Sequence, residues 1–403
     1  MNSRLNYQHT LLASYTGFIT QAIINNFAPL LFLTFQKDYQ IPLEKITLLV
    51  TANFGIQLLV DFLSAFFVDK IGHRPAMVAA HLFSAVGLIG LGVFPVWFSQ
   101  PYYGLFAAVA CYAIGGGLIE VLASPIVEAC PTKKKAATMS LLHSFYCWGS
   151  VFVILVSTLF FSFAGIDNWK DLAFLWAIIP LLNALYFTQV PIPRLVEEGK
   201  GMSPGSLFRH KLFWLFILLM ICAGASEQAM SQWASAFAES GLKIPKTVGD
   251  LAGPCFFAVL MGFARVFYAK YSEKIALGNF MAGCGCLCII SYLLAAFSPS
   301  PFASLVGCCL CGLSVGIFWP GTLSLAAQNC PRGGSAMFAL LALAGDVGCA
   351  AGPTLVGLVA GASGDNLTNG LVAALAFPVL LMCGLFLSRP STHVKASRPE
   401  EKT

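Results

Sequence analysis

Polar side chains recur at a regular spacing in an otherwise apolar stretch of the chain. Asn53, Gln57, Asp61 and Asp69 are separated by multiples of four residues, so in a helix they share one face. A further carboxylate, Glu120, stands in a second apolar stretch. Carboxylates accept hydrogen bonds and can take up protons, and amides both donate and accept hydrogen bonds. These residue types therefore suit the binding of protons and of a small polar molecule.

The composition indicates where this polar face must lie. Hydrophobic residues make up 58% of the 403 residues and charged residues only 10%, whereas soluble domains contain about 45–50% and about 25%. A soluble core cannot absorb this excess, so we expect a membrane protein. A polar face inside a membrane must face protein or water rather than lipid. The chain is therefore expected to guide a solute through a membrane and not to be an enzyme.

Apolar runs of membrane-spanning length, about 20 residues each, predict twelve spans. Backbone polar groups in hydrocarbon must be paired within the chain, and runs this long and continuous lack the alternation of a β-barrel. The expected fold class is an all-α membrane protein with twelve transmembrane helices. The spans are expected at 10–35, 46–68, 76–97, 101–128, 138–163, 170–189, 210–238, 247–268, 276–297, 301–326, 334–361 and 369–387.

The longest polar stretch divides these spans into six and six. It runs from Pro191 to Phe208 and is rich in proline, glycine and charge, as a linker between two bundles should be. We expect a six-helix bundle at 1–190, a cytoplasmic linker at 191–208, and a second bundle with a short cytoplasmic tail at 209–403.

The two halves also share a sequence pattern, which predicts two pseudo-symmetric bundles. Duplicated halves place a binding site near the midplane between them, and transport follows from rocking of one half against the other. At an offset of two hundred residues, Cys111, Gly116, Cys130 and Pro131 recur as Cys311, Gly316, Cys330 and Pro331.

The basic residues predict the orientation of the chain. Most of the 23 lysines and arginines fall in segments that face the cytoplasm if the N-terminus is inside, and cytoplasmic loops carry such an excess. Both termini are therefore expected in the cytoplasm, and the protein in the cytoplasmic membrane. The net charge of +5 follows from this bias. No basic stripe alternates with stacking aromatics, so nucleic-acid binding is not expected.

The loop after the second span carries the clearest family resemblance. Asp69-Lys70-Ile71-Gly72-His73-Arg74 resembles the signature loop of the major facilitator superfamily, and residues 262–274 resemble its weaker copy in the second half. Within that superfamily, residues 119–125 and 140–146 resemble the fucose-permease-like branch of sugar:proton symporters. The chain departs from these patterns at Ala65, where the signature has glycine, and at Ser124, where the branch has asparagine. The resemblance covers the whole chain and implies the major facilitator fold.

The same resemblance implies that Glu120 carries or senses the coupling proton. Independently, a carboxylate in an apolar part of a span loses hydration, which disfavours its ionised form and suits a proton carrier; a purely structural role is the alternative. The branch adds an aspartate in span one, but this chain has Asn25 and Asn26 there, which do not titrate. Asp61 is the second candidate for proton coupling, with a charge network involving Arg74 as its alternative.

Residues near the signature loop are expected to act in gating. Asp69 is followed by the Gly72 turn and by Arg74. A carboxylate at such a helix end can pair with a neighbouring helix end in one conformation and lose that pairing in the other. Arg265, inside span eight, either holds a gating ion pair or extends toward the membrane interface.

Several polar side chains within the spans are candidates for contact with the solute. In span seven, Glu227 lies one turn from Ser231 and Gln228 one turn from Gln232, and Trp233 adds a flat apolar surface. Sugars combine polar edges with an apolar face and need such a set, although any single amide could instead serve an interhelical hydrogen bond. The full set is Gln21, Asn25, Asn53, Gln57, Glu120, His143, Glu227, Gln228, Gln232, Trp233, Trp319 and Asp346.

Other chemistries find little support in the sequence. The fourteen cysteines lie almost entirely within spans and lack paired ligands in loops, so we expect free thiols, no metal site and no cofactor. No phosphate-binding Gly-x-x-x-x-Gly-Lys-Ser/Thr loop is present, which argues against an ATP-driven pump. Trp319-Pro320 is expected to mark a helix kink.

Together these features predict a secondary-active transporter that carries a small polar solute, a sugar in the leading interpretation, with protons. It is expected to work as a monomer in the lipid bilayer. The alternatives are an exporter or exchanger of another solute, such as a nucleoside, a peptide or a drug, and a non-transporting sensor built on a transporter scaffold.

Overall fold

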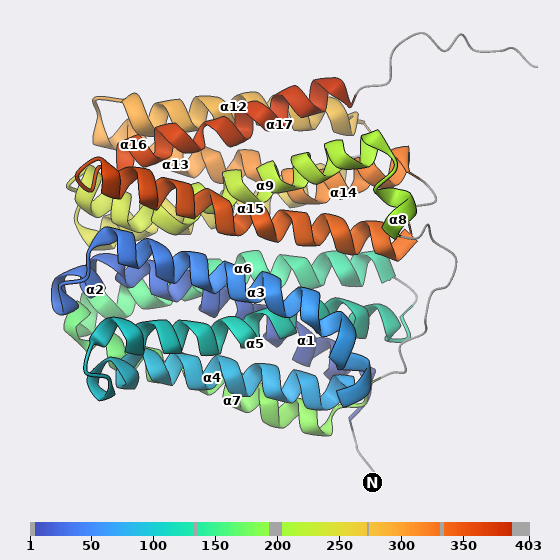
Figure 1. Ribbon diagram of the computed structural model, residues 1–403, viewed down its shortest axis with the longest axis horizontal. Helices are drawn as coiled ribbons and strands as arrows, with labels where there is room; N and C mark the ends of the chain where they lie inside the picture. Colours follow the sequence, from blue (N-terminus) through green and yellow to red (C-terminus); the bar gives the residue numbers. More distant parts are fainter. Residues whose placement is uncertain (1–4, 133–134, 193–203, 272–273, 331–333, 389–403) are drawn as a thin grey trace, which may run out of the picture.

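The computed structural model describes residues 5–132, 135–192, 204–271, 274–330 and 334–388. Over these residues it contains helices and no strand, and the helices run side by side along the long axis of the molecule (Figure 1). Twelve helical segments of the described chain are long and apolar enough to cross a membrane. The prediction of an all-helical protein with twelve spans is therefore confirmed.

The described residues of the first half form seven α-helices, which together provide six spans. A short 3-10 helix, η1 (Ala28–Leu31), joins α1 and α2 into one span, and η2 (Ile166–Asn168) precedes α7. The helices are α1 (Tyr7–Phe27), α2 (Phe32–Tyr39), α3 (Leu43–Ile71), α4 (His73–Trp97), α5 (Pro101–Ala129), α6 (Lys135–Ala164) and α7 (Trp169–Gln189).

The second half begins with the single turn α8 (Pro204–Leu207) and provides the other six spans. Two π-helical turns, η3 (Phe237–Gly241) and η4 (Leu251–Cys255), flank the short helix α10 (Lys246–Asp250). The helices are α9 (Lys211–Ala236), α11 (Phe256–Tyr271), α12 (Leu277–Phe297), α13 (Pro301–Val315), α14 (Phe318–Asn329), α15 (Gly334–Ala362), α16 (Leu367–Ala374) and α17 (Ala376–Leu387).

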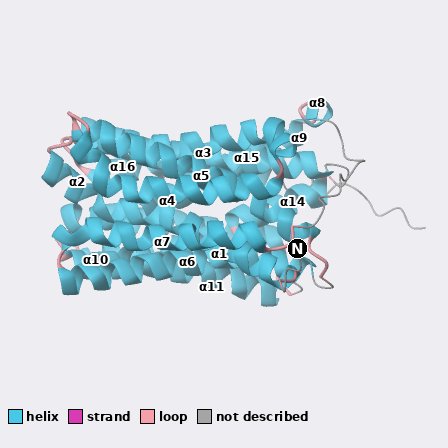
Figure 2. Ribbon diagram, turned by 90° about the horizontal axis from the view of Figure 1, so that it is seen from below, coloured by secondary structure: helices cyan, strands magenta, loops and turns pink. Residues whose placement is uncertain are grey.

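Helices of the two halves occupy opposite sides of the molecule. In Figure 1, α1 to α7 lie in the lower part and α9 to α17 in the upper part, with α3 and α6 facing the second half. Figure 2 shows that α2 and α10 lie at one end of the helices and α8 at the other. We call these the α2 end and the α8 end. The expected linker falls mostly on residues 193–203, and the expected tail on 389–403, which lie outside the described residues.

Close packing inside the first half depends on glycine. A Cβ atom at Gly115 of α5 would lie 2.3 Å from Ser84 Oγ and 2.4 Å from the carbonyl oxygen of Ala80, both on α4. Only a residue without a side chain allows this approach, because backbone atoms cannot yield. The pair α4 and α5 therefore forms a rigid wall from which α5 presents Glu120.

Proline lies at an interruption in each of two spans. Pro29 lies in η1, between α1 and α2, and Pro320 follows the break between α13 and α14. Proline has no N–H, so it leaves the carbonyl four residues earlier without its helical partner. These carbonyls belong to Asn25 and Gly316. The interruption of span ten lies close to the expected kink at Trp319-Pro320.

Candidate functional site

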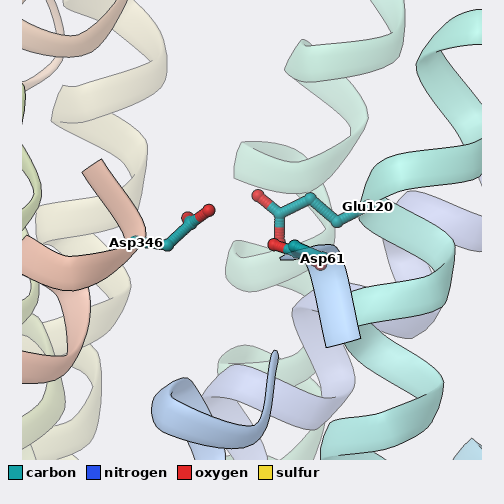
Figure 3. A group of neighbouring side chains, drawn as sticks. All are labelled: Asp61, Glu120 and Asp346. Atoms are coloured by element: carbon teal, nitrogen blue, oxygen red, sulfur yellow. The ribbon is translucent and has the colours of Figure 1, made fainter. Parts of the chain in front are cut away.

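Three carboxylates converge where the two halves meet. Asp61 comes from α3, Glu120 from α5 and Asp346 from α15, and Figure 3 shows the carboxyl group of Asp346 pointing across the interface toward the other two. One oxygen of each lies within 4.8 Å of the others. Among the described residues no lysine or arginine forms an ion pair with any of them. We call this group the acid cluster; such a group of oxygens could share protons or hold a cation.

Two adjacent glycines of α5 make room for the side chains around the acid cluster. A Cβ atom at Gly117 would lie 3.1 Å from Asp61 Oδ1, and one at Gly116 would lie 2.9 Å from Gln21 Oε1. Both distances are shorter than ordinary contacts, so a side chain at either position would displace these groups. In the structure these glycines allow α1 and α3 to approach α5 closely.

A network of amides extends from the acid cluster through the first half. Gln21 Nε2 donates to Glu120 Oε2 at 3.1 Å and to Gln57 Oε1 at 2.7 Å. Gln57 Nε2 in turn donates to Asn25 Oδ1 at 3.0 Å and to Asn53 Oδ1 at 2.9 Å. All four amides are buried. The predicted shared faces of α1 and α3 are therefore turned toward each other, and their amides bond mainly to one another.

The amide network continues into the second half at the backbone carbonyl of Asn25, which lacks its helical hydrogen bond because of Pro29. Gln232 Nε2, on α9, donates to the backbone oxygen of Asn25 at 3.0 Å and to Gln228 Oε1 at 3.1 Å. Because Pro29 cannot donate to that oxygen, Gln232 supplies the missing hydrogen bond. Gln228 Nε2 then approaches Glu227 Oε1 at 3.3 Å. A continuous polar path thus links Glu120 in one half to Glu227 in the other.

Glu227 faces the one arginine found inside the predicted spans. Arg265 Nη2 lies 3.9 Å from Glu227 Oε2, and Arg265 Nε donates to the carbonyl oxygen of Gly316 at 3.1 Å. That oxygen is the one left open by Pro320. Arg265 Nη1 also lies 3.2 Å from Cys147 Sγ of the first half. Of the two expectations for Arg265, the geometry therefore favours an ion pair over an extension to the interface.

The α2 end holds a second set of contacts between the halves. Lys246 Nζ, on α10, donates to the carbonyl oxygen of Leu30 at 2.6 Å and forms an ion pair with Asp250 at 3.0 Å. Asp250 is 1% exposed and also accepts from Ser235 at 2.5 Å. Further hydrogen bonds between the halves join Ser162 to Thr247 (3.0 Å), Gln36 to Asp365 (3.2 Å) and Thr51 to Thr354 (2.6 Å). The halves are therefore tied together at this end.

Three of the predicted gating residues, Asp69, Gly72 and Arg74, lie at the opposite, α8 end. Gly72 joins α3 to α4 with φ of +92°, a conformation that favours glycine. Arg74 Nη1 donates to the carbonyl oxygens of Phe187 and Thr188, at 2.8 Å and 2.7 Å, near the C-terminal end of α7. Arg74 therefore joins a helix end, as a cation prefers, and Asp61 belongs to the acid cluster instead of a network with Arg74. The side chain of Asp69 lies outside the described residues.

Two predicted solute contacts lie apart from the acid cluster. Trp233 is fully buried, packs against Phe32 and donates its Nε1–H to the carbonyl oxygen of Pro353 at 2.9 Å. This differs from the open stacking surface expected from the sequence, because the indole lies in the packed contact between the halves. His143 is exposed and meets Phe18 edge to face.

Trp319 is a further predicted solute contact, and it packs beside the acid cluster. The outer atoms of its ring lie 2.3 Å from the position that a Cβ atom at Gly345 would take. Gly345 directly precedes Asp346, so the indole covers the backbone that presents this acid. Any side chain at position 345 would push the ring away, which explains the need for glycine there.

Some residues of the site were not among the sequence candidates. Tyr146 receives a long hydrogen bond of 3.5 Å from Asn25 Nδ2, Cys147 approaches Arg265, and Lys246 binds Leu30. The signal for Tyr146 was its place in the span-five motif. Lys246 and Asp250 carried a weaker signal, the four-residue spacing of opposite charges on a helix. None of the fourteen cysteines, all of which lie in the described part of the chain, forms a disulfide, as the sequence predicted.

Comparisons with known proteins agree with this architecture. An uncharacterized MFS-type transporter of Enterobacter sp. (strain 638) is 22% identical over 378 residues, which cover 90% of this chain and 90% of that protein. The solved structure of the E. coli fucose:proton symporter FucP matches with a TM-score of 0.62 and 17% identity, over 94% of this chain and 98% of that one. The nucleoside transporter NupG matches with a TM-score of 0.73 and 12% identity, over 95% and 100%.

The family itself follows from a direct match. The family model described as Major Facilitator Superfamily matches residues 13–353 and, in a second match, 257–403. These ranges include every helix that contributes to the acid cluster, to the amide network and to the contacts at the α2 end. The chain belongs to the major facilitator superfamily and is a multi-pass membrane transporter, not an enzyme.

Proposed function

We propose that this transporter couples the entry of a small polar solute, most simply a sugar, to the movement of protons down their gradient. It works in the cytoplasmic membrane with both termini in the cytoplasm, so the α8 end faces inward and the α2 end outward. The excess of lysine and arginine in the segments at the α8 end supports this orientation. The two units that move are the bundles at 1–190 and 209–403.

The observation that carries the proposal is the acid cluster across the interface. Two unit charges about 4 Å apart repel by about 4 kcal/mol at the effective dielectric constant of a protein. Asp61, Glu120 and Asp346 are therefore more stable together when they share protons, whereas separation of the halves removes Asp346 from the other two. Proton binding then favours the arrangement in which the halves meet, and proton release favours their separation. This link between titration and conformation is what coupling requires.

The amide network supplies the polar surface for the solute. Amide groups donate and accept in equal measure, as a ring bearing several hydroxyl groups requires. In the present arrangement most of these amides bond to one another, so a solute enters by replacing such bonds with its own hydroxyl groups. The exchange of like hydrogen bonds favours a neutral, hydroxyl-rich molecule over a lipophilic one.

The test uses purified protein in proteoliposomes with an imposed pH gradient. Candidate solutes come first from a thermal-shift screen of sugars, nucleosides and amino acids, because a ligand of the folded state raises the melting temperature. Uptake of the selected solute should follow the pH gradient and should not follow a sodium gradient imposed at equal pH. Stabilisation by nucleosides alone would contradict the sugar assignment, and uptake driven by sodium alone would contradict proton coupling.

The variant that isolates coupling is Glu120→Gln. It keeps the shape of the side chain and a hydrogen-bonding group for Gln21 but removes the exchangeable proton. Accumulation driven by the pH gradient should be abolished, while solute binding and counterflow between equal pH values persist. Unaltered proton-driven uptake by Glu120→Gln would remove Glu120 from the coupling role.

A further inference from the structure

An apolar groove lies on the outer face of the second half, away from the interface. It occupies about 460 Å³ between α11, α12 and the nearby part of α13, within the range of about 300–1,000 Å³ that small-molecule sites occupy. Phe263 and Phe267 of α11 form one wall, and Phe280 of α12 forms the other. Phe267 and Phe280 are stacked with their centroids 6.1 Å apart.

This groove faces the surroundings of the protein and not the central site. Phe263 and Phe267 are one turn apart and share a face of α11, whereas Arg265, between them, points to Glu227 on the other side. Phe263 is 56% exposed. In a helix that crosses a membrane, an exposed apolar face of this kind contacts hydrocarbon. The molecules available to fill the groove are therefore lipids.

Two features distinguish the groove from the ordinary lipid-facing surface. First, it has an open floor: a Cβ atom at Gly283 would meet no atom within 4 Å. Second, two lysines lie at its end nearest the turn between α11 and α12. Lys270 lies one turn beyond Phe267, and Lys274 directly precedes Ile275, which lines the groove. Both lysines are exposed, and Lys270 Nζ lies 5.8 Å from the centre of the Tyr271 ring.

We propose that this groove binds one acyl chain of an anionic phospholipid, whose phosphate is held by Lys270 and Lys274. The apolar walls match a hydrocarbon chain, and the lysines stand where α11 ends and the membrane surface begins. Basic groups at the membrane surface attract anionic lipids, and long basic side chains can reach the headgroups while their stems follow apolar surface. Asn279, which also lines the groove, offers an amide close to the glycerol region.

The test is lipid retention by the full chain, purified in mild detergent and measured by native mass spectrometry. The protein is exposed to equal amounts of phosphatidylglycerol and phosphatidylcholine. The wild type should retain phosphatidylglycerol in preference. The variant K270Q/K274Q should lose about 30-fold in relative affinity for phosphatidylglycerol, as expected for about 1 kcal/mol per basic residue near an anionic surface.

A second pair of variants tests the groove itself. Gly283→Phe adds a ring at a position where a Cβ atom meets no neighbour within 4 Å, and it should reduce retention of both lipids. Its control, Cys286→Phe, adds the same ring on the exposed face of α12 outside the groove and should leave retention unchanged. Lys211→Gln, which removes an exposed lysine of α9, is the matched control for charge. Equal retention of the two lipids by the wild type, or unchanged retention by Gly283→Phe, would overturn the proposal.

Discussion

Glu120 and Glu227 are carboxylates of the same type, each on a long helix of its half, but their surroundings differ. Glu120 lies with Asp61 and Asp346 and receives a hydrogen bond from Gln21. Glu227 faces Arg265 at 3.9 Å. A nearby base favours the ionised form of an acid, whereas nearby acids disfavour it. The comparison teaches that the partner across the helix interface, more than burial alone, distinguishes the acid that we propose as a proton carrier from the acid that faces a cation.

The largest effect on stability is expected from removing the guanidinium group of Arg265. Arg265→Met leaves Glu227 buried without its partner and should lower the free energy of unfolding by about 3–5 kcal/mol. The double variant Arg265→Met/Glu227→Gln should regain most of that loss, because no unpaired charge remains. Thermal or denaturant unfolding in detergent measures both. Equal stability of the single and double variants would show that the ion pair does not distinguish Glu227 from Glu120.

Removal of an acid from the cluster should have the opposite effect on stability. Asp346→Asn relieves repulsion and should leave the melting temperature unchanged or raise it. Because it also removes one protonatable group from the interface, pH-driven accumulation of the solute should fall by about tenfold, equivalent to about 1.4 kcal/mol. Proteoliposome uptake and thermal unfolding of the same preparation measure the two effects. A clear loss of stability would indicate that Asp346 is ionised and paired, as Glu227 is.

The hydrogen bond between Gln232 and Asn25 connects the surroundings of Glu120 with those of Glu227. Its loss should have an intermediate effect on stability. Gln232→Ala leaves the carbonyl oxygen of Asn25 without a donor, at a cost of about 1–3 kcal/mol for a buried group. Binding of the solute should weaken, and the contact between the halves should open more often. Solute affinity and cysteine accessibility at the interface measure these changes. Gln328→Ala, at an exposed amide of α14, is the control and should match the wild type.

The smallest effect is expected from a substitution of Asp69, near the end of α3. Asp69→Asn should slow turnover about fivefold, equivalent to about 1 kcal/mol in the barrier, and leave solute affinity unchanged. The reason is that Asp69 lies near the end of α3, two helical turns beyond Asp61, where we propose that gating takes place. Initial rates and equilibrium binding separate the two quantities. A selective loss of affinity would instead assign Asp69 to the site.

Much of this comparison was visible in the pattern of residues. The four-residue spacing of Asn53, Gln57 and Asp61 placed them on one face, and their isolation among apolar residues turned that face inward. Gln21 and Asn25 were expected to share a face of the first span, and both bond to the amides of α3. Residue spacing along one helix does not determine the angle at which another helix packs against it, or which residues of the two helices are then in contact.

The hydrogen-bond and ion-pair partners of the polar groups show what residue spacing could not predict. Asp346 was a candidate for solute contact, and its place beside Asp61 became evident only when α15 was seen packed against α3. Gln232 was expected to meet the solute, yet its donor goes to the backbone of Asn25. Trp233 was expected as an open surface and is buried. Each outcome depends on the packing of two halves that are far apart in sequence.

The sequence by itself determined the membrane location, the twelve helices, the superfamily and the turn at Gly72, because these depend on local composition, periodicity and motif. Only the tertiary structure decided which acids meet each other, which acid meets Arg265, and which carbonyl oxygens are left open by Pro29 and Pro320 for Gln232 and Arg265 to bind. The physical reason is that electrostatic and hydrogen-bonding energies depend on distances of a few ångströms between helices, and one chain pattern is compatible with many such distances.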